Sequence, residues 1–82
     1  MTRENLYYVY MLRCADDTIY TGITTDLERR VRVHNDGKGA KYTRTRTPVE
    51  LVYSEPFESK SEALKREWQI KKLSRSDKLQ MF

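Results

Sequence analysis

The chain has 82 residues, with 16 lysines and arginines against 12 aspartates and glutamates, which gives a net charge of +4. This length lies near the lower limit for a hydrophobic core and predicts a single domain over residues 1–82. No apolar run could cross a membrane and no signal-peptide pattern opens the chain, so we expect a soluble cytoplasmic protein. The single cysteine, Cys14, excludes an intrachain disulfide and a zinc site built from several cysteines.

Two strands are expected at the beginning of the chain. Residues 6–13 are rich in aromatic and β-branched side chains, and nearly every position is apolar, which indicates a strand with both faces covered. Residues 18–23 follow after a short turn-prone stretch and predict an antiparallel hairpin. In such a hairpin Tyr10 and Tyr20 lie near each other across the two strands.

A helix is expected after the hairpin. Gly22 ends the second strand at a position where a Cβ would block a close approach. Thr25, followed three residues later by Glu28, has the spacing of a capping box that begins a helix at Asp26. Gly37 is suited to the left-handed conformation that ends a helix. The sequence therefore predicts a helix from about residue 26 to about residue 36.

One face of this helix departs from an ordinary amphipathic pattern. Positions 27, 30, 31 and 34 form one stripe at 3.6 residues per turn. Leu27 and Val31 suit a stripe that faces the core, whereas Arg30 and His34 do not. Such local departures from the pattern mark candidate functional sites.

The positive charge is concentrated between residues 29 and 46. This span holds seven lysines and arginines against one acidic residue, Asp36. Residues 37–48, which overlap the end of this span, contain two glycines and a proline, and we expect a mobile binding loop there. The charge indicates contact with phosphates. The alternative is a solvated face that keeps a small protein soluble.

A third strand and two helices complete the expected fold. Residues 49–57 predict a strand joined to the hairpin across a helix, as in a β-α-β unit, with Pro56 at its end or on a sheet edge. Ser59 begins a second capping box, and the helix over about residues 60–73 carries Ala63, Leu64, Trp68 and Ile70 on one broad apolar arc. A short last helix, begun by Ser74 or Ser76, brings Leu79, Met81 and Phe82 over one end of the core.

Glu67 falls inside the apolar arc of the second helix. A buried carboxylate costs several kcal/mol unless it is paired or holds a metal, and a single carboxylate suits Mg²⁺, which keeps most of its waters. An arginine fork fits a phosphate, and a tyrosine acts as a general base when nearby cations lower its pKa of about 10. Together these groups indicate a metal-assisted phosphodiesterase. Ordinary alternatives are an ion pair of Arg30 with Asp26, an ion pair of Glu67 with Lys71, a helix-end role for His34, and structural tyrosines.

The ordered set of motifs resembles the GIY-YIG nuclease family. Residues 8–10 are similar to its first motif and residues 20–22 to its second, at a typical separation. The segment LERRVRVH is similar to the helix that carries the family's essential arginine. Residues 63–71 resemble the segment with its metal-binding glutamate. The TGIT and GKGAK segments resemble small stand-alone bacterial members.

This resemblance implies a small three-stranded antiparallel sheet flanked by helices, in the order β-β-α-β-α(-α). It implies hydrolysis of DNA phosphodiester bonds with one Mg²⁺ or Mn²⁺ held by Glu67. Tyr10 or Tyr20 would activate the water, Arg30 would stabilise charge on the phosphate, and His34 would assist by hydrogen bonding. The residues we expect to contact nucleic acid are Tyr8, Gly22, Arg29, Lys38, Lys41, Arg44 and Arg46.

We expect weak sequence preference and a monomer, with branched, damaged (as in DNA repair) or single-stranded DNA as alternative targets. The main competing hypothesis is a non-catalytic nucleic-acid-binding module that keeps the fold and the basic loop. An interaction domain for an acidic protein partner is a second alternative.

Overall fold

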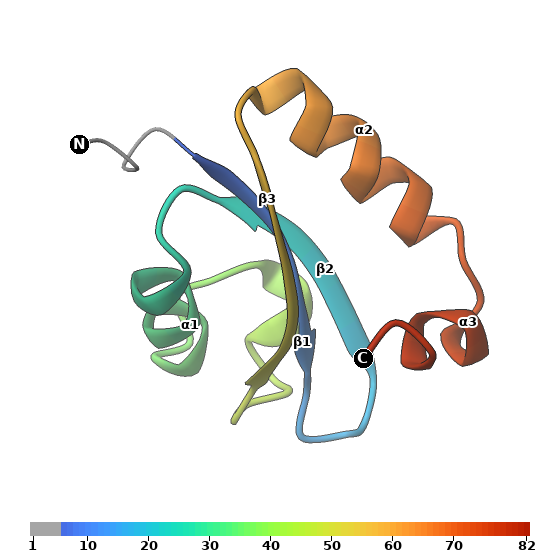
Figure 1. The fold of residues 1–82 in the computed structure, drawn as a ribbon. Coiled ribbons are helices and arrows are strands. Elements are labelled where there is room, and N and C mark those ends of the chain that lie inside the picture. Colours follow the sequence, from blue (N-terminus) through green and yellow to red (C-terminus); the bar gives the residue numbers. More distant parts are fainter. Residues whose placement is uncertain (1–5) are drawn as a thin grey trace.

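The computed structural model describes residues 6–82 and has a three-stranded antiparallel sheet with helices on both faces (Figure 1). The α+β class expected from the sequence is confirmed. The elements in chain order are β1 (Tyr7–Arg13), β2 (Ile19–Thr24), α1 (Leu27–Asn35), the 3-10 turn η2 (Lys41–Thr43), β3 (Glu50–Phe57), α2 (Lys60–Lys71) and α3 (Arg75–Leu79).

Strand β1 is the centre of the molecule, because the strand order is β2-β1-β3. Four successive residues of β1, from Val9 to Leu12, are buried. Val9 and Met11 belong to a cluster with Ala63 and Ile70 of α2. Tyr10 and Leu12 point to the opposite face, where they pack with residues of α1. Both faces of β1 are thus covered, as its unbroken apolar sequence indicates.

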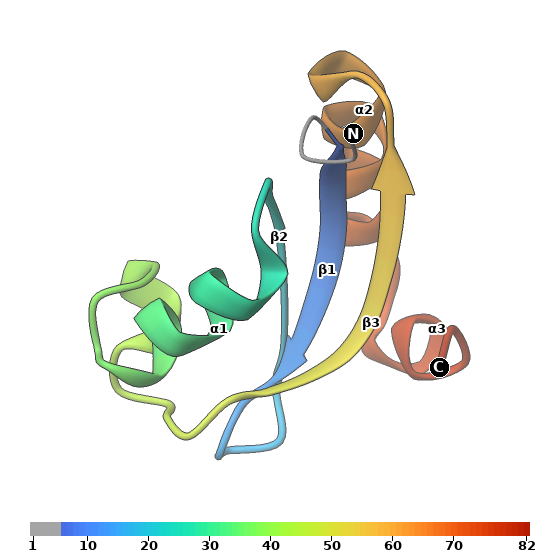
Figure 2. The ribbon, with the colours of Figure 1, turned by 60° about the vertical axis from the view of Figure 1, so that its left-hand side comes forward.

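The layers are clearly separated when the molecule is seen edge-on. In Figure 2, α1 and the segment that follows it lie on one side of the sheet, and α2 lies on the other. Strand β3 runs antiparallel to β1, so the parallel arrangement of a β-α-β unit is not formed. Pro56 pairs with Tyr8 on this outer strand, where a residue without a backbone N–H is tolerated.

The first helix begins one residue later than its sequence pattern predicts. Asp26, rather than Thr25, is the N-cap, and its carboxylate accepts a hydrogen bond from the backbone N–H of Arg29 at 3.1 Å. Gly37 has a φ of +77°, the left-handed conformation expected at the helix end. At the end of the helix, the Asn35 side chain accepts from the N–H of Val49 and donates to its C=O, which holds the residue before β3 against α1.

Helix α2 begins as predicted, because Ser59 accepts a hydrogen bond from the N–H of Glu62. Only part of its predicted apolar arc faces the core. Ala63 and Ile70 are fully buried, whereas the side chains of Leu64 and Trp68 are on the solvent side, with Trp68 62% exposed. The buried stripe therefore runs through positions 63, 67 and 70, which places Glu67 on the inner side of the helix. No helix within residues 6–82 is long and apolar enough to cross a membrane.

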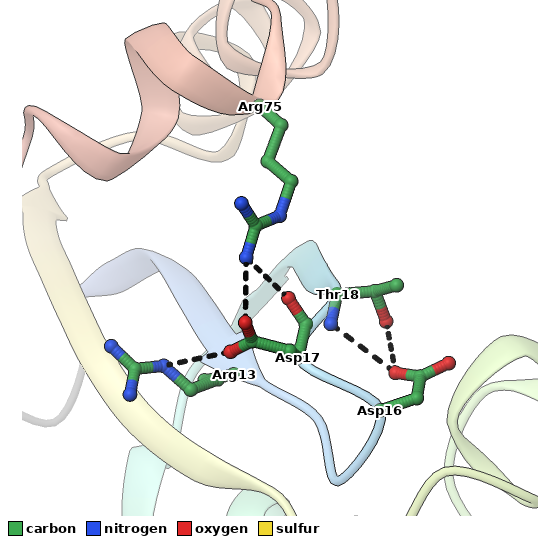
Figure 3. A network of polar contacts seen from close by, with 5 residues as sticks. All are labelled: Arg13, Asp16, Asp17, Thr18 and Arg75. Carbon is green, nitrogen blue, oxygen red and sulfur yellow. Dashed lines mark hydrogen bonds and ion pairs between the residues drawn. The ribbon is translucent and has the colours of Figure 1, made fainter.

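Helix α3 begins after its N-cap Ser74, and Met81, just beyond its end, packs against the cluster under α2. Figure 3 shows how α3 is tied to the β1–β2 turn. The Arg75 guanidinium donates to the backbone carbonyl of Asp17 at 2.8 Å and pairs with its carboxylate at 3.0 Å. Arg13 approaches the same carboxylate at 3.8 Å. These exposed contacts hold the last helix beside the hairpin end of the sheet.

Candidate active site

Tyr10 and Gly22 face each other directly in the β1–β2 ladder. A Cβ on Gly22 would lie 2.7 Å from the Tyr10 hydroxyl oxygen and 3.1 Å from a ring carbon of Tyr20. The phenol ring of Tyr10 therefore passes over the bare backbone of Gly22, where any other residue would obstruct it. Tyr20 lies two positions along the same face, and the two ring centroids are 6.3 Å apart.

The Tyr10 hydroxyl is joined to both unexpected residues of α1. Its oxygen accepts a hydrogen bond from Arg30 Nε at 3.3 Å, and it lies 3.0 Å from His34 Nε2. His34 has no exposed surface, and Tyr10 is 1% exposed. Asp26 caps the helix through its carboxylate, and the ion pairs described in residues 6–82 do not include Asp26 with Arg30. The stripe of α1 thus carries Arg30 and His34 inward to a tyrosine.

Thr43 of η2 completes this arrangement. Its hydroxyl lies 2.7 Å from His34 Nδ1 and donates its proton to the carbonyl of Ala40 at 2.9 Å. Because that proton is used, Thr43 accepts from His34, and His34 carries its proton on Nδ1. Nε2 then has a free lone pair and accepts the proton of Tyr10. The chain of hydrogen bonds runs from Arg30 through Tyr10, His34 and Thr43 and ends at the accepting carbonyl of Ala40.

The contribution of Thr43 could not be read from the sequence, because an isolated threonine in a basic loop gives no periodic signal. The contribution of Gly39 was likewise not evident from the sequence. Gly39 is buried, and a Cβ there would collide with the His34 ring. The segment expected to be a mobile loop is pinned to α1 by these two residues. Arg46 fastens it again, since its backbone carbonyl accepts from the N–H of Ala15 at 2.8 Å.

Burial fixes the protonation of the two central groups. It lowers the pKa of His34 to about 4, with a further contribution from the positive charge of Arg30, so His34 is neutral at pH 7. Burial raises the pKa of Tyr10; the hydrogen bond and charge of Arg30 oppose this, while Tyr20 and Glu67 add to it. At neutral pH the site therefore holds a phenol hydrogen-bonded to a neutral imidazole.

Tyr20 is held by a column of stacked groups on its outer side. Its ring stacks on Tyr42 at 5.9 Å with an interplanar angle of 25°, and the Arg46 guanidinium lies 4.0 Å from the centroid of Tyr42. Arg46 is anchored in turn by Asp16 at 2.8 Å and by the Tyr42 carbonyl at 2.7 Å. The loop thus supplies a rigid support for the ring of Tyr20.

Glu67 lies on the other side of the sheet from Arg30 and His34. It belongs to α2, whereas Arg30 and His34 belong to α1 on the opposite face (Figure 2). Its Oε2 pairs with Lys71 Nζ at 3.1 Å, and its side chain is 17% exposed. The i,i+4 pair that the sequence offered as the alternative to a metal site is therefore formed. Among the hydrogen bonds of the described residues, none joins Glu67 to Tyr10, Tyr20, Arg30 or His34, although its charge contributes to the raised pKa of Tyr10.

The surroundings of Glu67 suit an ion that takes few protein ligands. Residues 6–82 contain no group of three or more histidines, cysteines, aspartates and glutamates that could hold a metal. A half-buried carboxylate paired with one flexible lysine fits hydrated Mg²⁺, because Lys71 can move aside and water fills the remaining positions. Thr21 on the same side of β2 has a buried hydroxyl without a hydrogen-bond partner in this part of the chain, which adds an unused polar atom nearby.

The predicted nucleic-acid-binding residues are mostly on the surface. Arg29, Lys38, Lys41 and Arg44 are exposed, and the ion pairs of the described residues include none of them. Arg29 and Arg30 line a pocket of about 190 Å³ at the start of α1. The others are differently placed: Tyr8 is half-buried in β1, Gly22 is buried below Tyr10, and Arg46 is engaged with Asp16 and Tyr42.

Comparison with known proteins gives consistent results. Residues 6–80 match the family model described as the GIY-YIG catalytic domain. The chain is 59% identical over 76 residues to UPF0213 protein SH2523 of Staphylococcus haemolyticus, covering 93% of each protein. The solution NMR structure of UPF0213 protein BH0048 from Bacillus halodurans is 51% identical, with a TM-score of 0.60, over 93% of this chain and 81% of that one. The NMR structure of protein EF2693 from E. faecalis is 46% identical, with a TM-score of 0.66, over 99% and 86%.

Proposed function

Because the chain belongs to the GIY-YIG catalytic-domain family, we propose that it is a metal-dependent endonuclease that hydrolyses DNA phosphodiester bonds. The observation that carries the proposal is the hydrogen-bonded set of Arg30, Tyr10 and His34, in which Tyr10 and His34 are buried and Arg30 is partly exposed. In this set the phenol accepts from a guanidinium and donates to a neutral imidazole. An arginine and a histidine of this kind have no use in a small core, where an apolar pair would pack at lower cost. They have a use if charge or protons move at this point.

The two tyrosines differ in what they can reach. Tyr20 is half-buried and lines an open groove, so a water molecule can approach its hydroxyl. Tyr10 is closed off, and its proton is directed to His34. We therefore favour Tyr20, in its phenolate form, as the group that takes the proton from the attacking water. Tyr10 is the alternative, since geometry can tighten when substrate binds. His34 accepts the hydrogen bond of Tyr10 and holds that ring in place.

Arg30 has the role of stabilising the negative charge that develops on the phosphate. Its Nε is fixed by Tyr10, and the residue also lines the pocket at the start of α1, where a phosphate oxygen can approach. Glu67 would hold one Mg²⁺ or Mn²⁺, and the bound ion would supply positive charge at the scissile phosphate. We place the reaction in the cytoplasm, in keeping with the free thiol of Cys14.

The exposed cations supply the affinity for the nucleic acid. Arg29, Lys38, Lys41 and Arg44 lie on α1 and the loop that follows it, on the same side of the sheet as Arg30. These residues would contact the phosphate backbone rather than the bases, so the proposed preference for particular bases is weak. Branched, damaged and single-stranded DNA are therefore all included among the test substrates.

The test incubates the purified protein with supercoiled plasmid and with duplex, branched and single-stranded oligonucleotides, in Mg²⁺, Mn²⁺ or EDTA. Glu67→Gln and Arg30→Lys should each lower the cleavage rate by roughly 10²–10³. Matched controls are Glu62→Gln on the exposed side of α2 and Arg32→Lys on the exposed side of α1, which should cleave at the wild-type rate. Cleavage that persists in EDTA, or in both site variants, would refute the proposal.

The alternative function is a nucleic-acid-binding module without turnover. It is favoured by one observation, namely that Glu67 is already satisfied by Lys71 at 3.1 Å. This alternative predicts binding without cleavage in any divalent cation. If about four exposed cations contact phosphates, the logarithm of the binding constant should fall with the logarithm of salt concentration at a slope near −4.

A further inference from the structure

The outer edge of β2 borders a groove of which the proposed chemistry uses only Tyr20. The groove has a volume of about 340 Å³ and is formed by four separate elements. Its lining residues are Ile19, Tyr20 and Thr21 of β2, Tyr42 of η2, Lys71 of α2 and Lys78 of α3. Because β2 is an outer strand of the sheet, residues from the segments on both faces line the groove at this edge. Figure 1 shows β2 on the side of the sheet next to α3.

The groove carries positive charge on one wall. Lys71 and Lys78 come from two successive helices and both line it. Lys71 is neutralised by Glu67 at 3.1 Å, whereas the ion pairs of the described residues do not include Lys78. If Glu67 takes up a cation, Lys71 becomes free, and the groove then offers two ammonium groups. Its electrostatics thus suit an anion, the more so when Glu67 is occupied.

Thr21 gives an independent sign that a polar ligand belongs here. The residue is 3% exposed and lines the groove, and within residues 6–82 its hydroxyl is the buried side-chain group without a hydrogen-bond partner. An unsatisfied buried hydroxyl is unfavourable, and native structures rarely keep one without a reason. A rotation of 120° about χ1 moves the hydroxyl to another staggered position, from which it can meet a ligand.

We propose that this edge groove is a phosphate-binding subsite for the nucleic-acid strand, next to the phosphate that is cleaved. Tyr20 lines the groove and also belongs to the catalytic set, so a strand that presents one phosphate to Arg30 and Tyr20 continues along the edge of β2. The next phosphate then meets Lys78, Lys71 and the Thr21 hydroxyl. The inference rests on the proposed function, because it takes the same strand as its ligand.

The test measures binding of a short fluorescent single-stranded oligonucleotide in EDTA, as a function of salt concentration. Lys78→Gln should weaken binding several-fold and reduce the salt slope by about one. The control, Lys65→Gln, removes an equally charged exposed residue of α2 that does not line the groove, and it should have the smaller effect. Equal affinities and equal slopes for the two variants would overturn the proposal.

Thr21→Val provides a second test, in which stability and affinity should change in opposite directions. The variant removes the unsatisfied hydroxyl, so its melting temperature should rise, while its affinity for the oligonucleotide should fall. Unchanged affinity in a folded Thr21→Val variant would contradict the role of the hydroxyl.

Glu67→Gln should bind the strand more tightly than wild type in EDTA, because it frees Lys71, and more tightly than the charge-matched Glu62→Gln. If the two variants bind the oligonucleotide equally tightly, Lys71 does not contribute to binding in the groove, and this part of the proposal is wrong. These experiments measure binding in EDTA and do not measure cleavage. A failure of the catalytic proposal can therefore be distinguished from a failure of this one.

Discussion

Acid should destabilise this protein through one residue, His34. The pKa of His34 is lowered from 6.5 to about 4 because the ring is buried and lies near Arg30. Between these two values the unfolded chain binds a proton that the folded chain does not, so stability is complete above about pH 7 and falls as the pH decreases. With 1.36 kcal/mol per pKa unit, the loss is about 2 kcal/mol at pH 5 and approaches roughly 3 kcal/mol at pH 4.

The assay is urea unfolding followed by circular dichroism at pH 7.5, 6 and 5. The result is specific because His34 is the only histidine in the chain. Asp16 and Glu55 have pKa values held below the ordinary 3.8 and 4.5, mainly by hydrogen bonds and charge from Thr18, Tyr53 and arginines, so their stabilising contributions are lost only at lower pH.

The control variant is His34→Gln, which cannot take up a proton. It should be less stable than wild type at pH 7.5, but its free energy of unfolding should change little between pH 7.5 and 5. If the wild type and the variant lose the same stability over this range, the acid sensitivity does not come from His34, and the deduction that a neutral imidazole accepts from Tyr10 is wrong.

Three further predictions concern the supports of the site. Gly22→Ala should displace the Tyr10 hydroxyl, because the added Cβ would lie 2.7 Å from it. The fold should persist by circular dichroism while nuclease activity falls at least tenfold. Full activity of the variant would contradict this prediction. Thr43→Val should lose the Nδ1–H tautomer of His34, as seen in long-range proton–nitrogen NMR correlations, whereas Thr43→Ser should keep it. An unchanged spectrum in the valine variant would refute the assigned hydrogen-bond directions. Arg75→Ala should lower the free energy of unfolding by at most about 1 kcal/mol, because its ion pair is exposed, and a larger loss in urea unfolding would mean that α3 depends on this contact.

The sequence was most informative where structure is local. The apolar run of β1, the cap at Ser59 and the left-handed Gly37 depend on neighbours within a few residues, and they were predicted. For the last helix the sequence offered Ser74 or Ser76, and the structure has Ser74 as the N-cap. The cap of α1 was misplaced by one residue, because Thr25 and Asp26 are both good N-caps and the choice depends on how the chain leaves β2.

The candidate site was only partly predictable, for a related reason. Arg30 and His34 could be singled out because a charged group on a core-facing stripe breaks a periodic rule. Thr43 and Gly39 break no rule, and their importance comes from contacts with a helix several residues earlier in the chain. The same holds for the groove, whose two lysines look like ordinary surface residues until the helices are placed beside β2.

The sequence by itself determined the elements, their order, the surplus of positive charge and the inward direction of Arg30, His34 and Glu67. These follow from periodicity, capping and composition, which act over short distances along the chain. Only the tertiary structure decided that α1 and α2 cover opposite faces of the sheet, so that Arg30 and Glu67 lie on different sides of it. It also decided that Trp68 is left in solvent while Ala63 and Ile70 are buried. Both outcomes depend on how a helix is rotated and which face of the sheet it covers, and that is set by packing between segments far apart in sequence.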